Sequence, residues 1–166
     1  MKKKTALPAN FFALPWGHCL LIALALTGLA ALFLAPSAWQ FPMDDTYIHF
    51  VYAQNLARTG HLMFNQPGET GVGTTSLTWV LLLAGADRAG IPLNLAAKFF
   101  GWLALVSAGC GVYRLFLPLL RPRAAFALAL LASASGHMLW FALSGMETML
   151  FFALGVWALI LYQGRR

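Results

Sequence analysis

Apolar runs near the length of a membrane crossing constrain this 166-residue sequence more than any other feature. The first two runs, residues 12–35 and 93–119, contain only two charged side chains, and residues 124–143 and 144–162 follow as two further runs. A helix needs about 20 apolar residues to cross the ~30 Å hydrocarbon core of a bilayer. We therefore expect each of the four runs to form a transmembrane helix.

The composition excludes an ordinary soluble domain. Hydrophobic residues make up 60% of the chain and charged residues 10%, whereas roughly a quarter of a soluble domain is charged. The sequence thus predicts an all-α multi-pass membrane protein: a single membrane domain with about four transmembrane helices. Cys19 and Cys110 both lie inside apolar runs, so neither a disulfide framework nor a metal cluster is expected.

The basic residues predict the topology. The net charge is +6, and the basic clusters at residues 2–4, 121–123 and 165–166 each lie beside an apolar run. Such clusters favour the cytoplasmic side of a membrane, which places residues 1–11 in a cytoplasmic tail and both termini inside. This placement counts against a nucleic-acid groove, so no nucleic-acid partner is expected. Because Pro36 makes a poor signal-peptide cleavage site, the first run is interpreted as a retained span.

Between the first two spans lies a long segment, residues 36–92, that this topology places outside. It contains four of the five acidic residues. Residues 77–86 are apolar but too few to cross a bilayer, and are expected to form an interfacial helix from about residue 75 to 86. Apolar periodicity over residues 45–59, with Gly60 as a stop, predicts a second interfacial helix. A Gly- and Pro-rich segment with a turn at residues 65–68 would join them.

The predicted helix at residues 45–59 carries the first group of candidate functional side chains. Asp45, His49 and Tyr52 recur at spacings of four and three, so they share one helix face. A carboxylate, an imidazole and a phenol on one face could serve acid–base chemistry or bind a cation. The structural alternative is that Asp44 caps the helix and that Asp45 complements its dipole.

Two other polar segments also have a structural and a functional interpretation. Residues 71–76 are rich in glycine and hydroxyl groups and could hold a phosphate at a helix N-terminus, or could be a linker followed by an N-cap. Ser144 and Glu147 have the spacing of a capping box. Alternatively, Glu147 faces the same external cavity as Asp44 and Asp45.

Five segments together resemble the N-terminal part of membrane glycosyltransferases with the GT-C fold, in the branch that includes the mycobacterial terminal arabinofuranosyltransferases. Related proteins carry an Asp-Asp-Ala-Tyr-Ile stretch, an Arg-Tyr-Ala-x-Asn-Leu helix, a Gly-x-x-Phe-Asn-x-Gly-Glu turn, a Leu-Trp helix and a Ser-Gly-Leu-Glu-Thr segment. The similar segments here are Asp44-Asp45-Thr46-Tyr47-Ile48, Val51 to Leu56, Gly60 to Glu69, Leu77-Thr78-Trp79 and Ser144 to Thr148.

The resemblance implies an arabinofuranosyltransferase- or mannosyltransferase-like enzyme of the bacterial cytoplasmic membrane. Its partners would be a polyprenyl-phosphate-linked sugar donor, the lipid bilayer, and a glycan, lipid or protein acceptor of the cell envelope. Either Asp44 or Asp45 would be the catalytic base, while the other orients the acceptor or a divalent metal, the one cofactor that could be needed. Arg58 and Lys98 are the external basic residues that could meet a phosphate. The substrate-binding candidates are His49, Tyr52, Arg58, Asn65, Glu69 and Glu147.

Two other classes of protein stay open. Because such enzymes carry many more spans, we expect this chain to be a fragment of a longer protein. It could alternatively be a truncated, catalytically inactive membrane protein or the partner subunit of a split glycosyltransferase. A small four-span transporter is disfavoured, because the spans carry few polar residues at mid-membrane and the carboxylates gather in the segment at residues 36–92.

Overall fold

The computed structural model describes residues 15–34, 40–65 and 73–164. The lysines at residues 2–4, most of the turn at residues 65–68, Glu69 and the arginines at residues 165–166 lie outside these ranges. Within them the chain is all-helical, with no strand. The seven helices are α1 (Trp16–Leu34), α2 (Asp45–Thr59), α3 (Leu77–Arg88), α4 (Leu93–Phe116), α5 (Pro122–Ser133), α6 (Gly136–Leu143) and α7 (Thr148–Gln163).

The helices best suited to cross a membrane are α1 and α4. These two helices, of 19 and 24 residues, are long and apolar enough to cross a bilayer. A third crossing results if α5 and α6 are one bent span. The 16 residues of α7 are apolar but shorter, about 24 Å at 1.5 Å per residue. The fold is therefore that of an all-helical protein with two or three helices able to span a membrane.

The third apolar run differs from its expected form. A continuous helix was predicted for residues 124–143, but α5 and α6 meet at a 59° bend. The cause is local: the Ser135 hydroxyl accepts a hydrogen bond from the Met138 amide at 3.4 Å and so begins a new helix. The fourth run is shortened for a related reason, because Gly145 adopts a left-handed φ of 83° and α7 begins only at Thr148.

The two short helices between the first spans are confirmed as helices. The helix α2 has the predicted bounds and ends at Gly60, whose φ is 75°. The helix α3 begins at Leu77, two residues after the predicted start, with the Ser76 side chain as its N-cap. Buried side chains that include Tyr52, Trp79 and Leu83 pack α2 and α3 together and against the start of α4.

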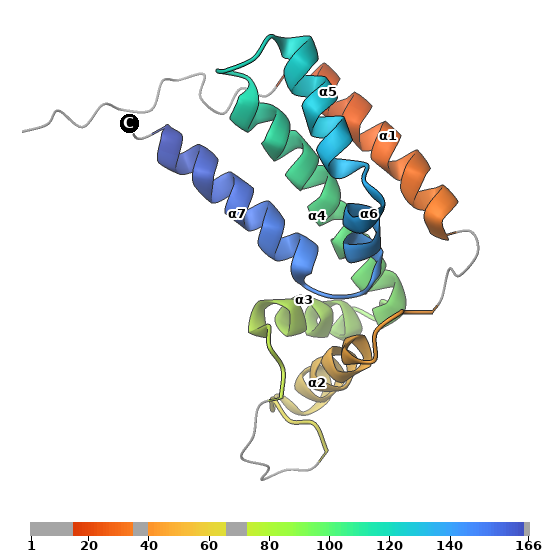
Figure 1. The fold of residues 1–166 in the computed structure, drawn as a ribbon. Helices are drawn as coiled ribbons and strands as arrows, with labels where there is room; N and C mark the ends of the chain where they lie inside the picture. Colours follow the sequence, from red (N-terminus) through yellow and green to blue (C-terminus); the bar gives the residue numbers. More distant parts are fainter. Residues whose placement is uncertain (1–14, 35–39, 66–72, 165–166) are drawn as a thin grey trace, which may run out of the picture.

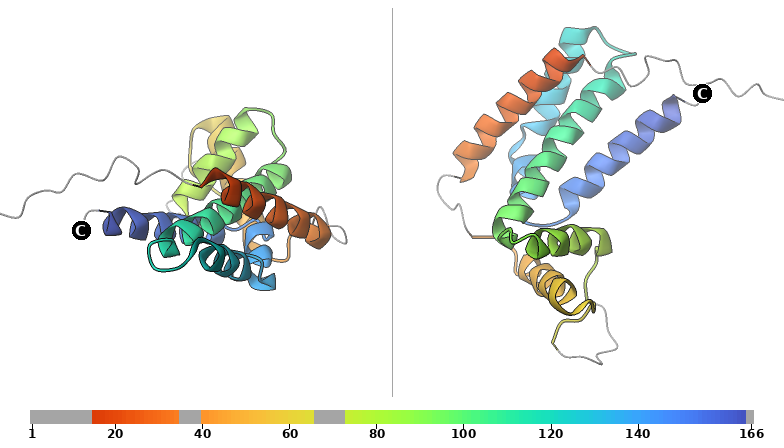
Figure 2. Two further views of the ribbon diagram at one scale, coloured as in Figure 1. Left: turned by 90° about the horizontal axis from the view of Figure 1, so that it is seen from above. Right: turned by 180° about the vertical axis from the view of Figure 1, so that it is seen from behind.

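Helix α4 forms the centre of the arrangement (Figure 1). It contacts α1, α3, α5, α6 and α7. The helices α2 and α3 lie crosswise at one end of this bundle. The start of α1, the connection from α4 to α5 and the end of α7 lie at the opposite end, as the view from behind also shows (Figure 2).

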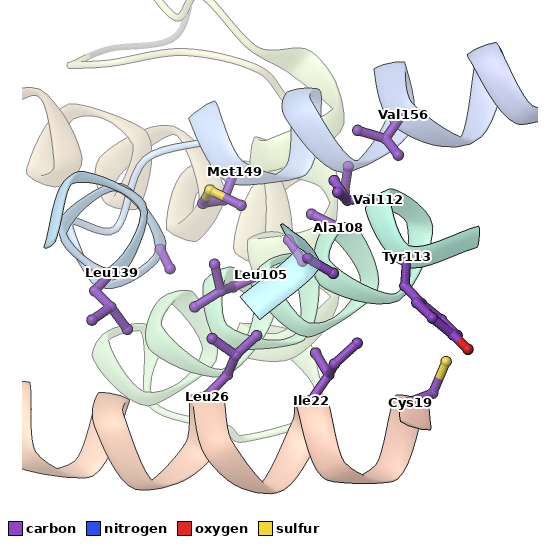
Figure 3. Close-up of a cluster of buried hydrophobic side chains, with 14 of the residues drawn as sticks. Cys19, Ile22, Leu26, Leu105, Ala108, Val112, Tyr113, Leu139, Met149 and Val156 are labelled. Atoms are coloured by element: carbon purple, nitrogen blue, oxygen red, sulfur yellow. The ribbon is translucent and has the colours of Figure 1, made fainter. Parts of the chain in front are cut away.

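Small residues on α4 let its neighbours approach closely. Leu105, Ala108 and Val112 of α4 point toward side chains of α1 and α7 in the buried cluster of Figure 3. A methyl group on Gly101 would overlap the backbone carbonyl oxygen of Ala142 in α6. Small residues serve this role in membrane helices, where packing and not the hydrophobic effect holds helices together.

Gly101→Ala should therefore destabilise the bundle. Because the obstructing atom belongs to the backbone, the helices α4 and α6 must separate, at a cost typical of overpacking, about 1–3 kcal/mol. The free energy of unfolding in mixed micelles measures this change. Gly155→Ala on α7 is the matched control, because its added methyl group has no neighbour within 4 Å. Equal stability of the two variants would contradict the close α4–α6 approach.

Candidate functional site

Polar side chains of α2 and α3 contact the turn at residues 144–147, which lies between α6 and α7; we call this contact the junction. The Thr46 hydroxyl donates a hydrogen bond to the carbonyl oxygen of Ser144 at 2.8 Å. The Trp79 indole N–H donates to the carbonyl oxygen of Gly145 at 2.9 Å. Thr46, Trp79 and Ser144 are all buried. These bonds satisfy backbone groups that the turn exposes between two helices.

Glycine is required at the centre of this turn for two reasons. Gly145 has a positive φ, which side chains rarely adopt. A Cβ atom there would also overlap Thr46 Cγ2 and crowd the ring of Phe41. The close approach of α2 to the turn therefore depends on the missing side chain.

At the centre of the junction lies the imidazole of His49, which is 2% exposed. Its Nδ1 lies 2.9 Å from Thr74 Oγ1, and its Nε2 lies 3.3 Å from Glu147 Oε2. The other carboxylate oxygen of Glu147 accepts a hydrogen bond from the Thr75 hydroxyl at 3.0 Å. One carboxylate and one imidazole thus tie α2, the segment before α3 and the start of α7 to one another.

The protonation of this group follows from burial. Desolvation lowers the pKa of His49 below its usual value, and the charges of Glu147 and Asp45 partly oppose that shift. Neutral imidazole fits the geometry, with an Nε2 proton toward Glu147 and the Nδ1 lone pair toward the Thr74 hydroxyl. Glu147 Oε2 is buried and lies 3.3 Å from His49 Nε2, but this contact does not have hydrogen-bond geometry, and no other residue that the structure describes donates to this oxygen.

Asp45 lies in the first turn of α2, as the dipole interpretation expects, but the side-chain capping bonds expected of Asp44 and Glu147 are not formed. Asp44 occupies the N-cap position of α2 but makes no capping hydrogen bond, and Asp44 and Asp45 are both exposed. Glu147 makes no capping bond to α7. The Ser144 hydroxyl donates to the carbonyl oxygen of Phe141 at 3.0 Å and accepts from the Met146 amide at 3.4 Å. Glu147 is therefore free to face the side of α2 that carries His49.

Tyr52, another predicted site residue, and Asn55 bond neighbouring segments of the chain to α2. The Tyr52 hydroxyl is buried and accepts a hydrogen bond from the Gly73 amide at 2.7 Å. The Asn55 amide group donates to the carbonyl oxygens of Met63 and Phe64, both at 2.9 Å. These bonds hold the chain on either side of residues 66–72 against α2.

Two other predicted site residues that the structure describes, Arg58 and Asn65, lie away from the junction. Arg58 is exposed in the last turn of α2, about 20 Å along the helix from Asp45. Asn65 is exposed beyond the end of α2, and Glu69 lies outside the described residues. The structure thus groups His49 and Glu147, with Asp45 on the next turn of α2, and separates them from Arg58.

Lys98 is a second polar centre, near the junction. Its ammonium group is buried near the N-terminal end of α4, within 3.5 Å of the carbonyl oxygens of Gln40 and Leu143 and 4.4 Å from the centre of the Phe41 ring. Within residues 15–34, 40–65 and 73–164 it has no carboxylate partner. It borders a cavity of about 240 Å³, lined also by Pro42 and Ser144, and an apolar groove of about 270 Å³ between α1 and α4.

No group of three or more His, Cys, Asp or Glu side chains in the described part of the chain could hold a metal ion. Metal binding by Asp44 and Asp45 thus stays a prediction. The segment before α3 fits the structural interpretation, because Ser76 Oγ accepts from the Trp79 amide as an ordinary N-cap and Thr74 and Thr75 contact His49 and Glu147.

No protein-family model, curated protein or solved structure matches this chain. Its function is therefore inferred from its residues and their geometry. Sequence patterns singled out His49 and Glu147 separately as candidate site residues, but not Thr46, Thr75 or Trp79. No local pattern could have found them, since Thr46 and Ser144 are 98 positions apart.

Thr46→Val should weaken the junction at nearly constant side-chain volume. It leaves the buried carbonyl oxygen of Ser144 without its donor, which costs about 1–3 kcal/mol of unfolding free energy. Unfolding in mixed micelles measures the loss. Thr78→Val, at an exposed position of α3, is the matched control and should change stability by less than about 0.5 kcal/mol. A Thr46→Val variant as stable as the control would show that the bond contributes nothing.

Proposed function

We propose that this chain is the N-terminal part of a membrane glycosyltransferase of the GT-C type. It would transfer a sugar from a polyprenyl-phosphate donor to an extracytoplasmic glycan, lipid or protein acceptor. One observation carries the proposal: three separate segments of the family resemblance meet in the junction. Thr46 comes from the Asp-Asp segment, Trp79 from the Leu-Trp helix, and Gly145 from the Ser-Gly-Met-Glu-Thr segment. Segments that build one site are expected to meet in this way.

The base would come from the start of α2. Asp44 and Asp45 are exposed there, where an acceptor could reach them. One carboxylate takes the proton of an acceptor hydroxyl, and the oxygen then attacks the anomeric carbon. The bond from that carbon to the phosphate oxygen breaks, and the polyprenyl phosphate leaves with the electron pair. This displacement inverts the anomeric configuration, and the second carboxylate orients the acceptor or a divalent metal.

Lys98 is the basic residue best placed to meet the leaving phosphate. Its cavity is lined by Pro42, two residues before Asp44, and the apolar groove beside it runs between α1 and α4. A buried cation with no carboxylate partner in the described residues favours an anion. Arg58, at the far end of α2, is less well placed for this role.

For the membrane, we propose four crossings: α1, α4, the bent pair α5–α6, and α7. Supporting this, the described chain ends and the connection that carries Arg121 and Arg123 lie together, opposite α2 and α3 (Figure 1). With the basic end inside, both termini are cytoplasmic and the junction is external. The membrane would be the bacterial cytoplasmic membrane.

Asp44→Asn and Asp45→Asn test the catalytic assignment. Asn retains the shape of Asp, and neither side chain makes a capping bond, so both variants should fold and insert normally. Loss of a positioned general base should lower transfer by about 100-fold or more in one of them. The measurement is sugar transfer from radiolabelled polyprenyl-phosphate arabinose or mannose by the full-length protein in its native membranes.

Asp87→Asn, at the far end of α3, is the matched control and should transfer at the wild-type rate. Equal transfer by the wild type and both α2 variants would remove these aspartates from the mechanism. No transfer by the wild type with either sugar would instead favour an inactive chain or the partner subunit of a split enzyme.

A further inference from the structure

We propose that His49 and Glu147 form a proton-sensitive latch, which holds α2 and the segment before α3 against the turn between α6 and α7 and which acid loosens. The latch would act whatever reaction the chain supports, so it does not rest on the proposed sugar transfer.

His49 is the residue of this latch that contacts both of the other segments. Its two ring nitrogens contact two different segments, Thr74 before α3 and Glu147 before α7. Glu147 also accepts the Thr75 hydroxyl. A change at this one ring therefore affects three segments at once.

The charged and titratable groups around the His49 imidazole affect how readily it binds a proton. Two titratable side chains act on it: Glu147 from the turn before α7, and Asp45 from the preceding turn of α2. The segment before α3 contributes Thr74 and Thr75, which do not titrate near neutral pH. The only charges that act on the imidazole from the described residues are thus negative, and burial opposes them.

Burial decides the direction of the response. Desolvation lowers the pKa of His49 in the folded protein despite its two acidic neighbours. A histidine whose folded pKa lies below its unfolded value binds a proton more readily when the junction opens. The stabilisation is complete above the unfolded pKa of about 6.5 and is lost as pH falls through the folded pKa.

Loosening would be local. The bonds from Thr46 to Ser144 and from Trp79 to Gly145 do not titrate, so mild acid should open the junction more often without unfolding the bundle. Because α2 carries Asp44 and Asp45, each opening would move both carboxylates relative to the Lys98 cavity. Acid would in this way control the geometry of the candidate site.

Hydrogen exchange of the whole chain in lipid nanodiscs tests the latch. The exchange rate of amides in residues 44–53 and 73–80 is compared between the wild type and His49→Gln at each pH, which cancels the intrinsic pH dependence of exchange. Gln keeps one donor and one acceptor but does not titrate. The wild-type to variant ratio should rise as pH falls from 7 to 5, by at most about tenfold per pH unit for one linked proton.

His61→Gln is the matched control, since His61 is exposed just beyond α2. The ratio of wild type to this variant should stay flat with pH. A flat ratio for His49→Gln as well would overturn the latch. A ratio that falls with acid would also overturn it, because protonation would then tighten the junction.

A second measurement needs no variant of His49. Titration of ring-labelled histidine by NMR should give His49 a pKa below its ordinary value, and Glu147→Gln should lower it further by removing a favourable charge. A pKa of His49 at or above the ordinary value would overturn the proposal even if His49→Gln failed to insert.

Discussion

The backbone carbonyl groups that the turn between α6 and α7 exposes need hydrogen-bond donors, and side chains of α2 and α3 supply two of them. The carbonyl oxygens of Ser144 and Gly145 are each bonded by a side chain more than 60 positions away in sequence. Glu147 is held by Thr75 and lies beside His49. The placement of α2, and with it Asp44 and Asp45, depends on these contacts.

The elements were largely predictable because their signals are local. Apolar runs predicted α1 and α4, and helical periodicity with a glycine stop predicted α2 with its observed bounds. The break between α5 and α6 was missed because apolar composition alone does not show it; one serine hydroxyl competes for a backbone amide and starts a new helix. The contact of His49 with Glu147 joins residues 98 positions apart, which no spacing pattern can reveal.

Helix α4 connects the helix bundle to the junction. Its glycine and alanine positions bring α1, α6 and α7 close, and its N-terminal end carries Lys98, which donates to the carbonyl oxygen of Gln40 in the segment that leads to α2. Helix α6 packs against α4, and the turn that follows α6 is the one to which α2 docks. The candidate site therefore depends on small residues within helix α4.

The most direct test of this account is crosslinking across the junction in membranes. Thr75→Cys and Glu147→Cys, in a chain with Cys19→Ala and Cys110→Ala, should react together with a short bifunctional thiol reagent, since their native side chains touch at 3.0 Å. The control pair uses Thr59→Cys with Glu147→Cys, because Thr59 lies about 15 Å along α2 from His49. Efficient crosslinking of the first pair and little of the second is the predicted result. Equal crosslinking of both pairs would contradict the docking of α2 and α3 on the turn.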